Sequence, residues 1–420
     1  MLLCQSKILP NSTCAKLWKK IKMVNKTIAT DYDLIATIDE AEKIGLARWL
    51  KNQLADAFKD ARRGKTGTHD EHNFEINHLK NLDNLAESIL LHVYKTSSST
   101  AFVVKEPVPR EVFAASFRDR SVHHFLYNMS ADWWDRRFID GSSSCRKGRG
   151  TLFAVKKAQQ HMRRASANGT KKAWIIKCDL KGYFMSLPRE KVYQRIHWGL
   201  RKQFDCVLER PMGKQVFAIC DYLWRVTIMD DPVSRAVKRG NPHDWDPNIL
   251  PPDKSLFNHP QGEGIVIGNL TSQLASNIYL DQLDRFVTLT LGYKNYGRYV
   301  DDFYFIVEDK DYKKAKENLS VIRQYLKDEL DLTLHPKKLQ IQPVSHGMEF
   351  VGARVYLRTL YPSDRLQARL KRAAYRLASG QGSEDKLLTS FQSYLGLVSH
   401  YNADQFLSEI FNNLGWDYPY

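Results

Sequence analysis

Two apolar segments that end in aspartate place the tightest constraint on how this chain can fold. Residues 174–179 (Trp-Ile-Ile-Lys-Cys-Asp) form a β-like run that finishes at Asp179. Residues 296–307 contain two β-like runs that meet at Asp301 and Asp302, as the strands of a hairpin would. If the two segments adjoin in one sheet, their carboxylates converge, and like charges that close together need cations to remain ionised. The sequence therefore predicts a sheet with a cation site at one end.

Magnesium is the cation that this arrangement favours. It prefers hard oxygen ligands and is usually held by one or two carboxylates together with substrate phosphates. Two such ions about 3.5–4 Å apart stabilise the attacking and leaving oxygens of a phosphoryl displacement. The 420-residue chain has 63 Lys and Arg residues against 47 Asp and Glu residues, a net charge of +16 that favours a polyanionic partner. Carboxylates in so basic a chain indicate nucleotidyl transfer on a nucleic acid.

The basic residues are concentrated in two parts of the sequence. Residues 141–178 contain ten Lys and Arg residues and no Asp or Glu, which favours a track for a phosphate backbone over an ordinary solvated face. After Asp364, four arginines recur at helical spacing opposite an apolar face: Arg365, Arg369, Arg372 and Arg376. Both parts are candidate nucleic-acid contacts.

The rest of the pattern predicts a mixed α and β chain. Helical spacing occurs within residues 35–58, 69–95 and 118–137, β-like residues occur around 102–108, and residues 226–260 read as a long irregular connection. The aromatic-rich tail at 390–401 is helical in character.

No apolar run is long enough for a signal sequence or a membrane span, and six scattered cysteines give no disulfide framework. We therefore expect a cytoplasmic protein with no membrane partner.

Seven segments resemble, in the same order, the motifs of reverse transcriptases. Tyr-Val-Asp-Asp at 299–302 resembles their YxDD box, and Cys-Asp-Leu-Lys-Gly-Tyr-Phe at 178–184 resembles the motif of their first catalytic aspartate. The five other segments resemble the two fingers motifs, the motif between the aspartate motifs, and the two that follow the box: 102–120, 144–151, 264–273, 332–338 and 347–352. The resemblance covers roughly residues 60–400.

This resemblance implies a role for particular residues. Asp179, Asp301 and Asp302 would be the catalytic metal ligands, for two Mg²⁺ ions or for Mn²⁺ in their place, and Lys338 or its neighbour Lys337 would protonate the departing pyrophosphate. The residues that would contact the incoming deoxynucleotide or the nascent pair are Lys105, Arg110, Phe184, Ile267, Gly268 and Gln273. Phe184 would exclude a 2′-hydroxyl. Gly352 would belong to the primer-gripping hairpin, and Arg146, Lys147, Arg149 and the four arginines after Asp364 would bind nucleic acid.

The implied fold is the α+β right hand of a polymerase, with fingers, a palm that carries an antiparallel sheet, and a helical thumb. We expect an N-terminal extension over 1–60, fingers with part of the palm over 61–170, palm over 171–354 with an insertion at 205–260, and thumb over 355–420. The implied reaction is RNA-directed DNA synthesis. Its partners would be a structured template RNA, a DNA primer or cDNA, dNTPs, and a small basic accessory protein or a second copy of the chain.

One motif points to a branch of the family. Most reverse transcriptases carry Gln-Gly followed by Ser-Pro, whereas this chain has Ile267 and Gly268 followed by Ser272 and Gln273. This substitution resembles the error-prone enzymes of bacterial diversity-generating retroelements, as does Leu-Pro-Pro-Asp-Lys-Ser-Leu-Phe at 250–257. Bacterial antiphage defence enzymes, which copy a non-coding RNA, also carry peripheral additions and remain the near alternative.

Two other classes of function stay open. A catalytically idle RNA-binding scaffold would account for the positive charge, although such proteins tend to lose the acidic ligands that are all present here. A metal-binding regulator built on His69, Asp70, Glu71 and His72 lacks a second pair of ligands, so a solvated loop is the better interpretation.

Overall fold

The computed structural model describes residues 40–64, 67–106, 108–380 and 382–417. These residues form two compact units, which combine segments from distant parts of the sequence. Unit 1 comprises the described parts of Met1–Arg137 together with Gly182–Tyr279, and unit 2 comprises Phe138–Lys181 together with Leu280–Tyr420. Most of the expected N-terminal extension, residues 1–39, lies outside the described residues.

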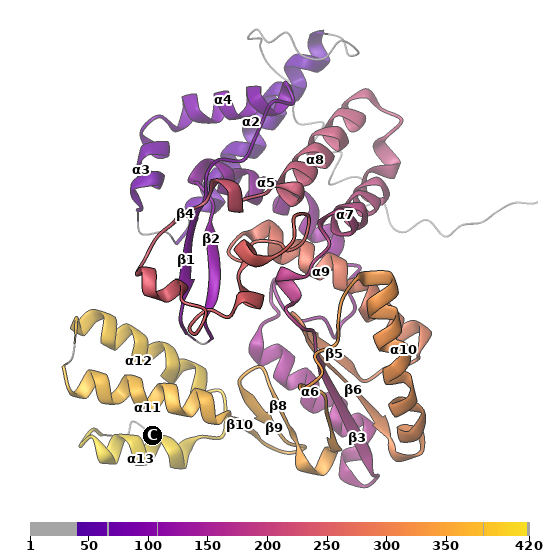
Figure 1. Cartoon of the computed structure of the whole chain (residues 1–420), viewed down its shortest axis with the longest axis vertical. Coiled ribbons are helices and arrows are strands. Elements are labelled where there is room, and N and C mark those ends of the chain that lie inside the picture. Colours follow the sequence, from indigo (N-terminus) through magenta and orange to yellow (C-terminus); the bar gives the residue numbers. More distant parts are fainter. Residues whose placement is uncertain (1–39, 65–66, 107, 381, 418–420) are drawn as a thin grey trace, which may run out of the picture. The chain divides into compact units, whose positions relative to one another are not determined.

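Unit 1 is mainly helical (Figure 1). The predicted helical regions are present, and the region at 69–95 is divided into two helices at Asn77. The helices are α2 (Glu40–Arg62), α3 (His69–Ile76), α4 (His78–Leu90), α5 (Phe117–Asp135), α7 (Arg189–Phe204) and α8 (Pro211–Met229). Leu46, Leu50 and Leu54 recur every fourth residue along one side of α2 and are buried. Helix α2 packs against α5, where Trp49 meets the edge of Phe125.

A three-stranded sheet completes unit 1. Strands β1 (Thr100–Val104) and β2 (Arg110–Ala114) form an antiparallel hairpin, and β4 (Val237–Lys238) pairs with β1 in parallel. After α8 ends, the segment at 226–260 contains four short 3₁₀ turns joined by irregular backbone, in agreement with the irregular connection expected. Its contribution of β4 to the sheet was not expected. The two-residue length of this strand explains why the sequence gives no β pattern there.

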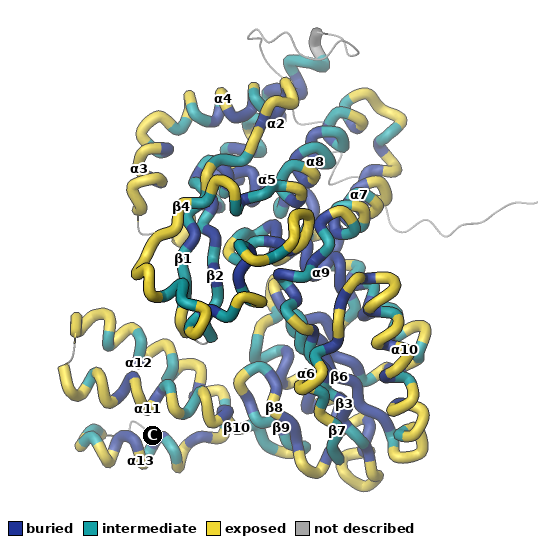
Figure 2. The backbone as a smooth tube through the Cα atoms, in the orientation of Figure 1, coloured by how far each residue is buried: buried dark blue, intermediate teal, exposed yellow. Residues whose placement is uncertain are grey.

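Unit 2 contains the antiparallel sheet that the sequence predicts. Its strand order is β5 (Tyr296–Tyr299), β6 (Asp302–Glu308), β3 (Ala173–Asp179) and β7 (Gln340–Pro343). Strands β5 and β6 form the predicted hairpin, and β6 also pairs with β3, all antiparallel. Their central residues are buried on both faces, which Figure 2 shows in dark blue.

One core joins this sheet to a second sheet and to helix α6 (Thr151–Ala165). The second sheet has the order β10 (Leu360–Pro362), β9 (Ala353–Val355) and β8 (Met348–Phe350). Apolar side chains of α6, β3 and β6 pack with those of β8 and β9 in a single buried cluster. Helices α9 (Leu270–Arg285) and α10 (Tyr312–Leu330) lead into and out of the β5–β6 hairpin.

Three helices follow the second sheet: α11 (Asp364–Ala378), α12 (Glu384–Val398) and α13 (Asp404–Asn413). The expected helices at 365–376 and within 390–401 are present as α11 and α12, whereas α13 was not predicted. The side chain of Ser363 caps α11 by accepting from the backbone N–H of Leu366 at 3.3 Å. The three helices share a separate apolar core that includes Leu370, Phe391 and Phe411.

The cysteines differ from expectation in one respect. Cys145, Cys178 and Cys220 are free thiols, whereas Cys206 is disulfide-bonded, which the scattered spacing did not predict. The spacing of the cysteines therefore does not by itself support the expected cytoplasmic location. In the described ranges of the chain, no helix combines the length and apolar character that a bilayer crossing requires.

His161 makes the stability of unit 2 dependent on pH. Only 5% of its surface is exposed, and its Nδ1 lies 3.0 Å from the hydroxyl of Tyr304. Burial in the first place, and then the charges of Lys157 and Arg164, lower its pKa from 6.5 to about 4. The unfolded chain thus binds the proton more tightly, so stability is lost as the pH falls from about 6.5 towards 4, by roughly 2 kcal/mol at pH 5.

We expect His161→Gln to lose this part of the pH dependence when urea unfolding is compared at pH 7 and pH 5. The matched control is His123→Gln in unit 1, because burial also lowers the pKa of His123 to about 4. That variant retains the contribution of His161. An unchanged difference between pH 7 and pH 5 in His161→Gln would contradict the assignment.

Candidate active site

Pairing of β3 with β6 brings the predicted carboxylates together. Asp179, the last residue of β3, lies directly opposite Asp302, the first residue of β6, and Asp301 precedes it in the hairpin turn. Burial, followed by the nearby charge of Asp179, raises the pKa of Asp301 to about 6. Burial also raises the pKa of Asp302 to about 7, although the charge of Lys177 opposes the shift. Negative charge is therefore costly here without a compensating cation.

Two lysines supply positive charge to these carboxylates. Lys338 Nζ lies 3.0 and 3.1 Å from the two carboxylate oxygens of Asp179. Lys177 Nζ lies 3.0 Å from Asp302 Oδ2. Lys338 is held near the site because the backbone N–H of His335 donates to the carbonyl of Asp179 at 2.7 Å. Lys338 was predicted from the family motif, whereas Lys177 was not.

The turn that carries Asp301 has a strained backbone. Val300 has a φ of 59°, a conformation that a β-branched residue rarely adopts. Two hydrogen bonds hold it: the Val300 N–H donates to Ser144 Oγ at 2.9 Å, and Arg298 Nη1 donates to the Val300 carbonyl at 2.9 Å. Such strain persists only where the surroundings impose it, and it is typical of functional sites.

A fully buried ion pair also supports this turn. Arg298 donates to both carboxylate oxygens of Asp284 at 2.7 Å, and neither side chain is exposed. The hydroxyl of Tyr296 also donates to Asp284 at 2.6 Å. Arg298 therefore connects helix α9 to the turn between β5 and β6.

The donor set fits hard divalent cations. Asp302 Oδ1 is buried and accepts no hydrogen bond among the described residues, so one carboxylate oxygen lacks a partner that a cation would supply. Within the same residues, no three or more His, Cys, Asp or Glu side chains gather closely enough to bind a metal by themselves. Magnesium in phosphoryl-transfer sites takes one or two carboxylates and completes its shell with phosphate oxygens and water. The carboxylates here match that type of site.

Several residues predicted to contact the nucleotide lie together in unit 1. The Phe113 N–H in β2 donates to the carbonyl of Ile267 at 2.8 Å, and the Ile265 N–H donates to that of Phe184 at 2.8 Å. Gly268 has a φ of +123°, and a Cβ at this position would lie 2.7 Å from the Phe113 carbonyl oxygen. No other residue fits there without displacing β2. The loop at 262–268 is thus fitted against both the hairpin and the turn at 183–185.

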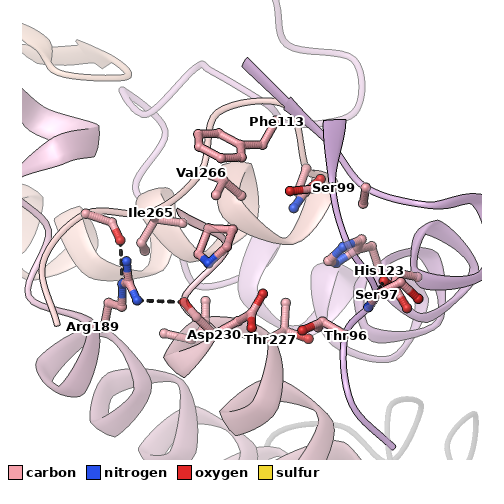
Figure 3. A pocket seen from close by; sticks show the side chains of 16 residues that line it. Thr96, Ser97, Ser99, Phe113, His123, Arg189, Thr227, Asp230, Ile265 and Val266 are labelled. Atoms are coloured by element: carbon pink, nitrogen blue, oxygen red, sulfur yellow. Dashed lines mark hydrogen bonds between the residues drawn. The ribbon is translucent and has the colours of Figure 1, made fainter. Parts of the chain in front are cut away.

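Arg189, which sequence reasoning missed, fixes this loop (Figure 3). Its buried guanidinium donates to the carbonyls of Gly264 at 2.7 Å and Asp230 at 2.6 Å. It also donates to the carbonyl of Glu263 at 3.1 Å. Next to the loop lies a cavity of about 40 Å³. The hydroxyls of Ser99 and Thr227 line it and have no hydrogen-bond partner in the described part of the chain.

The other predicted nucleotide contacts are less constrained. Lys105 follows β1, and its Nζ lies 2.7 Å from Asp244 Oδ1 in the irregular connection. Arg110 is the first residue of β2, directly opposite Val104. Gln273 is exposed in the first turn of α9.

The predicted nucleic-acid contacts fall into two groups. Arg146 is buried and donates to the carbonyls of Ile139 and Ser142, both at 2.8 Å, so it also supports the fold. Arg149 pairs with Asp140 at 2.9 Å, and Lys147 is exposed. On α11, Arg365, Arg372 and Arg376 are exposed, and Arg369 is half-buried. Gly352, with a φ of +81°, forms the β8–β9 turn and accepts from the Ser363 N–H at 3.0 Å.

The residues missed by sequence reasoning share one property. Each makes a hydrogen bond or an ion pair with a residue that is remote in sequence or that only the strand pairing brings near. These residues are Lys177, Ser144, Arg189 and Arg298. Of the four, only Lys177 could have been predicted from the sequence. Residues two apart on a strand share a face, and Lys177 precedes Asp179 by two.

Comparison with known proteins identifies one family. The family model described as "Reverse transcriptase (RNA-dependent DNA polymerase)" matches residues 114–355, more than half of the chain. No curated protein matches the sequence.

Comparison with solved structures finds telomerases at low sequence identity. Telomerase from Candida tropicalis with a TWJ fragment of telomeric RNA is 12% identical, with a TM-score of 0.43 over 77% of this chain and 56% of that one. The corresponding complex from Candida albicans is 9% identical, with a TM-score of 0.43 over 77% and 57%. The match thus spans less than two thirds of either telomerase chain.

The Arg298–Asp284 pair gives a direct test of how the turn is supported. We expect Arg298→Met to lower the unfolding free energy by about 3–5 kcal/mol, because it leaves the buried Asp284 carboxylate without its cation. The double variant Arg298→Met/Asp284→Asn removes both charges and should recover much of the loss. Chemical denaturation monitored by circular dichroism measures both effects. Equal stability of the single and double variants would refute this role of the pair.

Proposed function

The chain belongs to the reverse transcriptase family of RNA-dependent DNA polymerases, and we propose that it synthesises DNA on an RNA template. Family membership also agrees with the expected α+β fold class of the right-hand polymerases. The observation that carries the proposal is the register of β3 and β6, which places Asp179 opposite Asp302 beside Asp301. The domain boundaries at 60, 170 and 354 remain predictions.

The proposed reaction is attack of a primer 3′-hydroxyl on the α-phosphate of a dNTP. Asp179 and Asp301 would be the principal ligands of two Mg²⁺ ions, or of Mn²⁺ in their place, with Asp302 as the weaker third. Divalent ions bound there stabilise the negative charge that develops on the attacking and leaving oxygens. The strained turn and the buried ion pair beneath it hold Asp301 in place before substrate arrives.

Lys338 is proposed to act on the leaving group. Its ammonium contacts both oxygens of Asp179 and is 57% exposed on its side chain, so it can exchange this partner for a phosphate. In that position it donates a proton to the departing pyrophosphate. Lys177 remains with Asp302 and limits the repulsion among the carboxylates.

Residues of unit 1 are proposed to select the nucleotide. Lys105 and Arg110 bind the triphosphate, for which Lys105 exchanges its pairing with Asp244. Phe184 excludes a 2′-hydroxyl and thereby favours deoxynucleotides. Ile267, Gly268 and Gln273 lie under the nascent pair, and the hydrogen bonds of Arg189 to the loop keep them in place.

The nucleic acid is proposed to contact basic residues of unit 2. Arg146, Lys147 and Arg149 and the arginines of α11 would neutralise phosphates, and the turn at Gly352 would support the primer. The template is a structured cognate RNA. A small basic accessory protein or a second copy of the chain is the further partner proposed, and the cytoplasm is the proposed compartment.

We propose diversity generation as the biological role. Ile267 stands where most of the family carry glutamine, so a polar check on the geometry of the nascent pair is absent. Loss of such a check would permit error-prone copying. Antiphage defence with a non-coding RNA template is the alternative role within the same reaction.

The metal-ligand assignment predicts the phenotype of Asp301→Ala. This change removes one of the carboxylates proposed to hold the divalent ions, so we expect primer extension on RNA to fall by at least a thousandfold. RNA affinity, measured by fluorescence anisotropy, should stay within about threefold because phosphate contacts dominate it. Asp328→Ala on the exposed side of α10 is the matched control. Retained extension in Asp301→Ala would defeat the metal assignment.

The proposed role predicts which errors the cDNA contains. RNA that co-purifies with the protein and the DNA made on it are sequenced for wild type and for Asp301→Ala/Asp302→Ala, which controls for contaminating DNA. We expect active-site-dependent cDNA with substitutions concentrated at template adenines. Ile267→Gln, which restores the usual polar side chain, should reduce these substitutions about tenfold.

Other outcomes of this experiment assign other roles. Faithful or repetitive cDNA from a structured non-coding RNA would favour defence. Indistinguishable wild-type and double-variant samples would favour the RNA-binding scaffold and refute DNA synthesis.

A further inference from the structure

The exposed side of α6 carries two cations, Lys156 and Arg163. Phe153, Lys156, Gln160 and Arg163 follow one another at intervals of three or four residues and therefore share a face. Helix α6 contains no acidic residue, and its apolar side is buried against the two sheets of unit 2. Near its start, Asp140 is the adjoining acid and is paired with Lys157 and Arg149. We call Lys156, Gln160 and Arg163 the α6 strip.

The strip continues into the turn between β9 and β10. Arg163 Nε donates to the carbonyl of Leu357 at 2.6 Å, and Gln159 Nε2 donates to that of Tyr356 at 2.9 Å. The Tyr356 N–H donates to the carbonyl of Thr359 at 3.0 Å and closes the turn. Because these bonds fix the turn to the helix, Arg358 on the turn adds to the charge of the strip.

A cavity of about 700 Å³ opens beside this turn. Its lining includes Arg354, Tyr356, Arg358, Tyr361 and Gln367, which we call the tyrosine pocket. The rings of Tyr356 and Tyr361 lie 5.9 Å apart at 81°, and Tyr361 is 40% exposed. Arg354 pairs with Asp364, and Glu349 lies opposite Arg354 on β8, whereas Arg358 has no acidic partner among the described residues.

The chemistry of the strip and the pocket matches single-stranded nucleic acid. Aromatic rings stack on bases of any sequence, and lysines and arginines follow the phosphates. The volume of the pocket lies within the range of small-molecule sites and accommodates a nucleotide. From Phe153 to Arg163 the helix spans about 15 Å, which is long enough to contact several consecutive nucleotides. No large apolar side chain is exposed on α6, which disfavours a membrane or an apolar protein partner.

We propose that the α6 strip and the tyrosine pocket bind an unpaired nucleic-acid strand, with a base stacked on Tyr361 and phosphates on Arg358, Arg163 and Lys156. The pocket is separate from the turn at Gly352, because β9 has that turn at one end and the Tyr356–Thr359 turn at the other. This proposal rests on the proposed function in one respect. If the chain synthesises DNA on RNA, the bound strand is the RNA template or the DNA product.

Anisotropy with the full chain and no dNTPs tests the proposal. The probes are an RNA–DNA duplex without an overhang and the same duplex with a ten-nucleotide overhang, either RNA or DNA, which distinguishes template from product. We expect the overhang to raise affinity at least tenfold in wild type. Tyr361→Leu should remove most of that gain, because it abolishes stacking, whereas Tyr361→Phe should retain it.

The phosphate contacts have a separate readout. Arg163→Gln/Arg358→Gln should lower the slope of log affinity against log salt by about 1.4 for the overhang probe, since each contact with a single strand contributes about 0.7. The matched control, Arg201→Gln/Lys202→Gln on the exposed end of α7, removes the same charge from unit 1 and should leave the slope unchanged.

Three results would overturn the proposal. The first is an overhang gain that survives in Tyr361→Leu. The second is an equal loss of affinity for both probes, which would indicate a general defect or a duplex site. The third is unchanged nucleic-acid binding together with loss of a co-purifying protein, which would assign the surface to a protein partner. A wild-type protein that shows the overhang gain but makes no DNA would refute the proposed function and leave this site standing.

Discussion

The antiparallel pairing of β3 with β6 is the constraint on which the site depends. In this register Asp179 faces Asp302 across two strands whose central residues are buried. A slip of one residue would turn every side chain of β3 to the opposite face and separate the carboxylates. The apolar cluster shared with α6 and the second sheet excludes that slip, because it requires Ile175 and Tyr304 on the same side. The core of unit 2 therefore sets the position of the chemistry.

Two sets of charged groups lie around the β5–β6 hairpin and play different parts. Below the turn, Arg298 and Asp284 are fully buried and satisfy each other, so their charges serve the backbone geometry of Val300. In the turn itself, Asp301 and Asp302 have raised pKa values because burial disfavours their charge and the nearby charge of Asp179 adds to the shift. The Arg298–Asp284 pair is closed to solvent and ligands. The carboxylates of Asp301 and Asp302, by contrast, would be stabilised in their charged form by a bound cation. That difference supports the proposal that Asp301 and Asp302 hold divalent cations.

Unit 1 positions its residues by a different means, through backbone contacts. The loop at 262–268 approaches β2 so closely at Gly268 that a side chain there would collide with the Phe113 carbonyl. Arg189 then satisfies two carbonyls of this loop, those of Glu263 and Gly264, and ties the loop to the end of α8 through the carbonyl of Asp230. The loop that carries Ile267 is therefore held by β2 and by Arg189.

The amino-acid sequence by itself determined the local elements and the chemical identity of the site. Apolar β-like runs predicted the strands around Asp179 and Asp301, and the spacing of the arginines after Asp364 predicted helix α11. These signals are short-range, so they survive without knowledge of the fold. The sequence did not predict the short strand β4 or the bonding of Cys206, because neither leaves a local pattern.

Only the tertiary structure decided which distant groups meet. The pairing of Lys177 with Asp302, the support of Val300 by Ser144, and the tyrosine pocket beside α6 all join residues from separate elements. The same applies to Arg146, whose place in a basic run suggested exposure but whose guanidinium is buried on backbone carbonyls. Contacts of this kind depend on packing and register, which are properties of the whole core and not of any one segment.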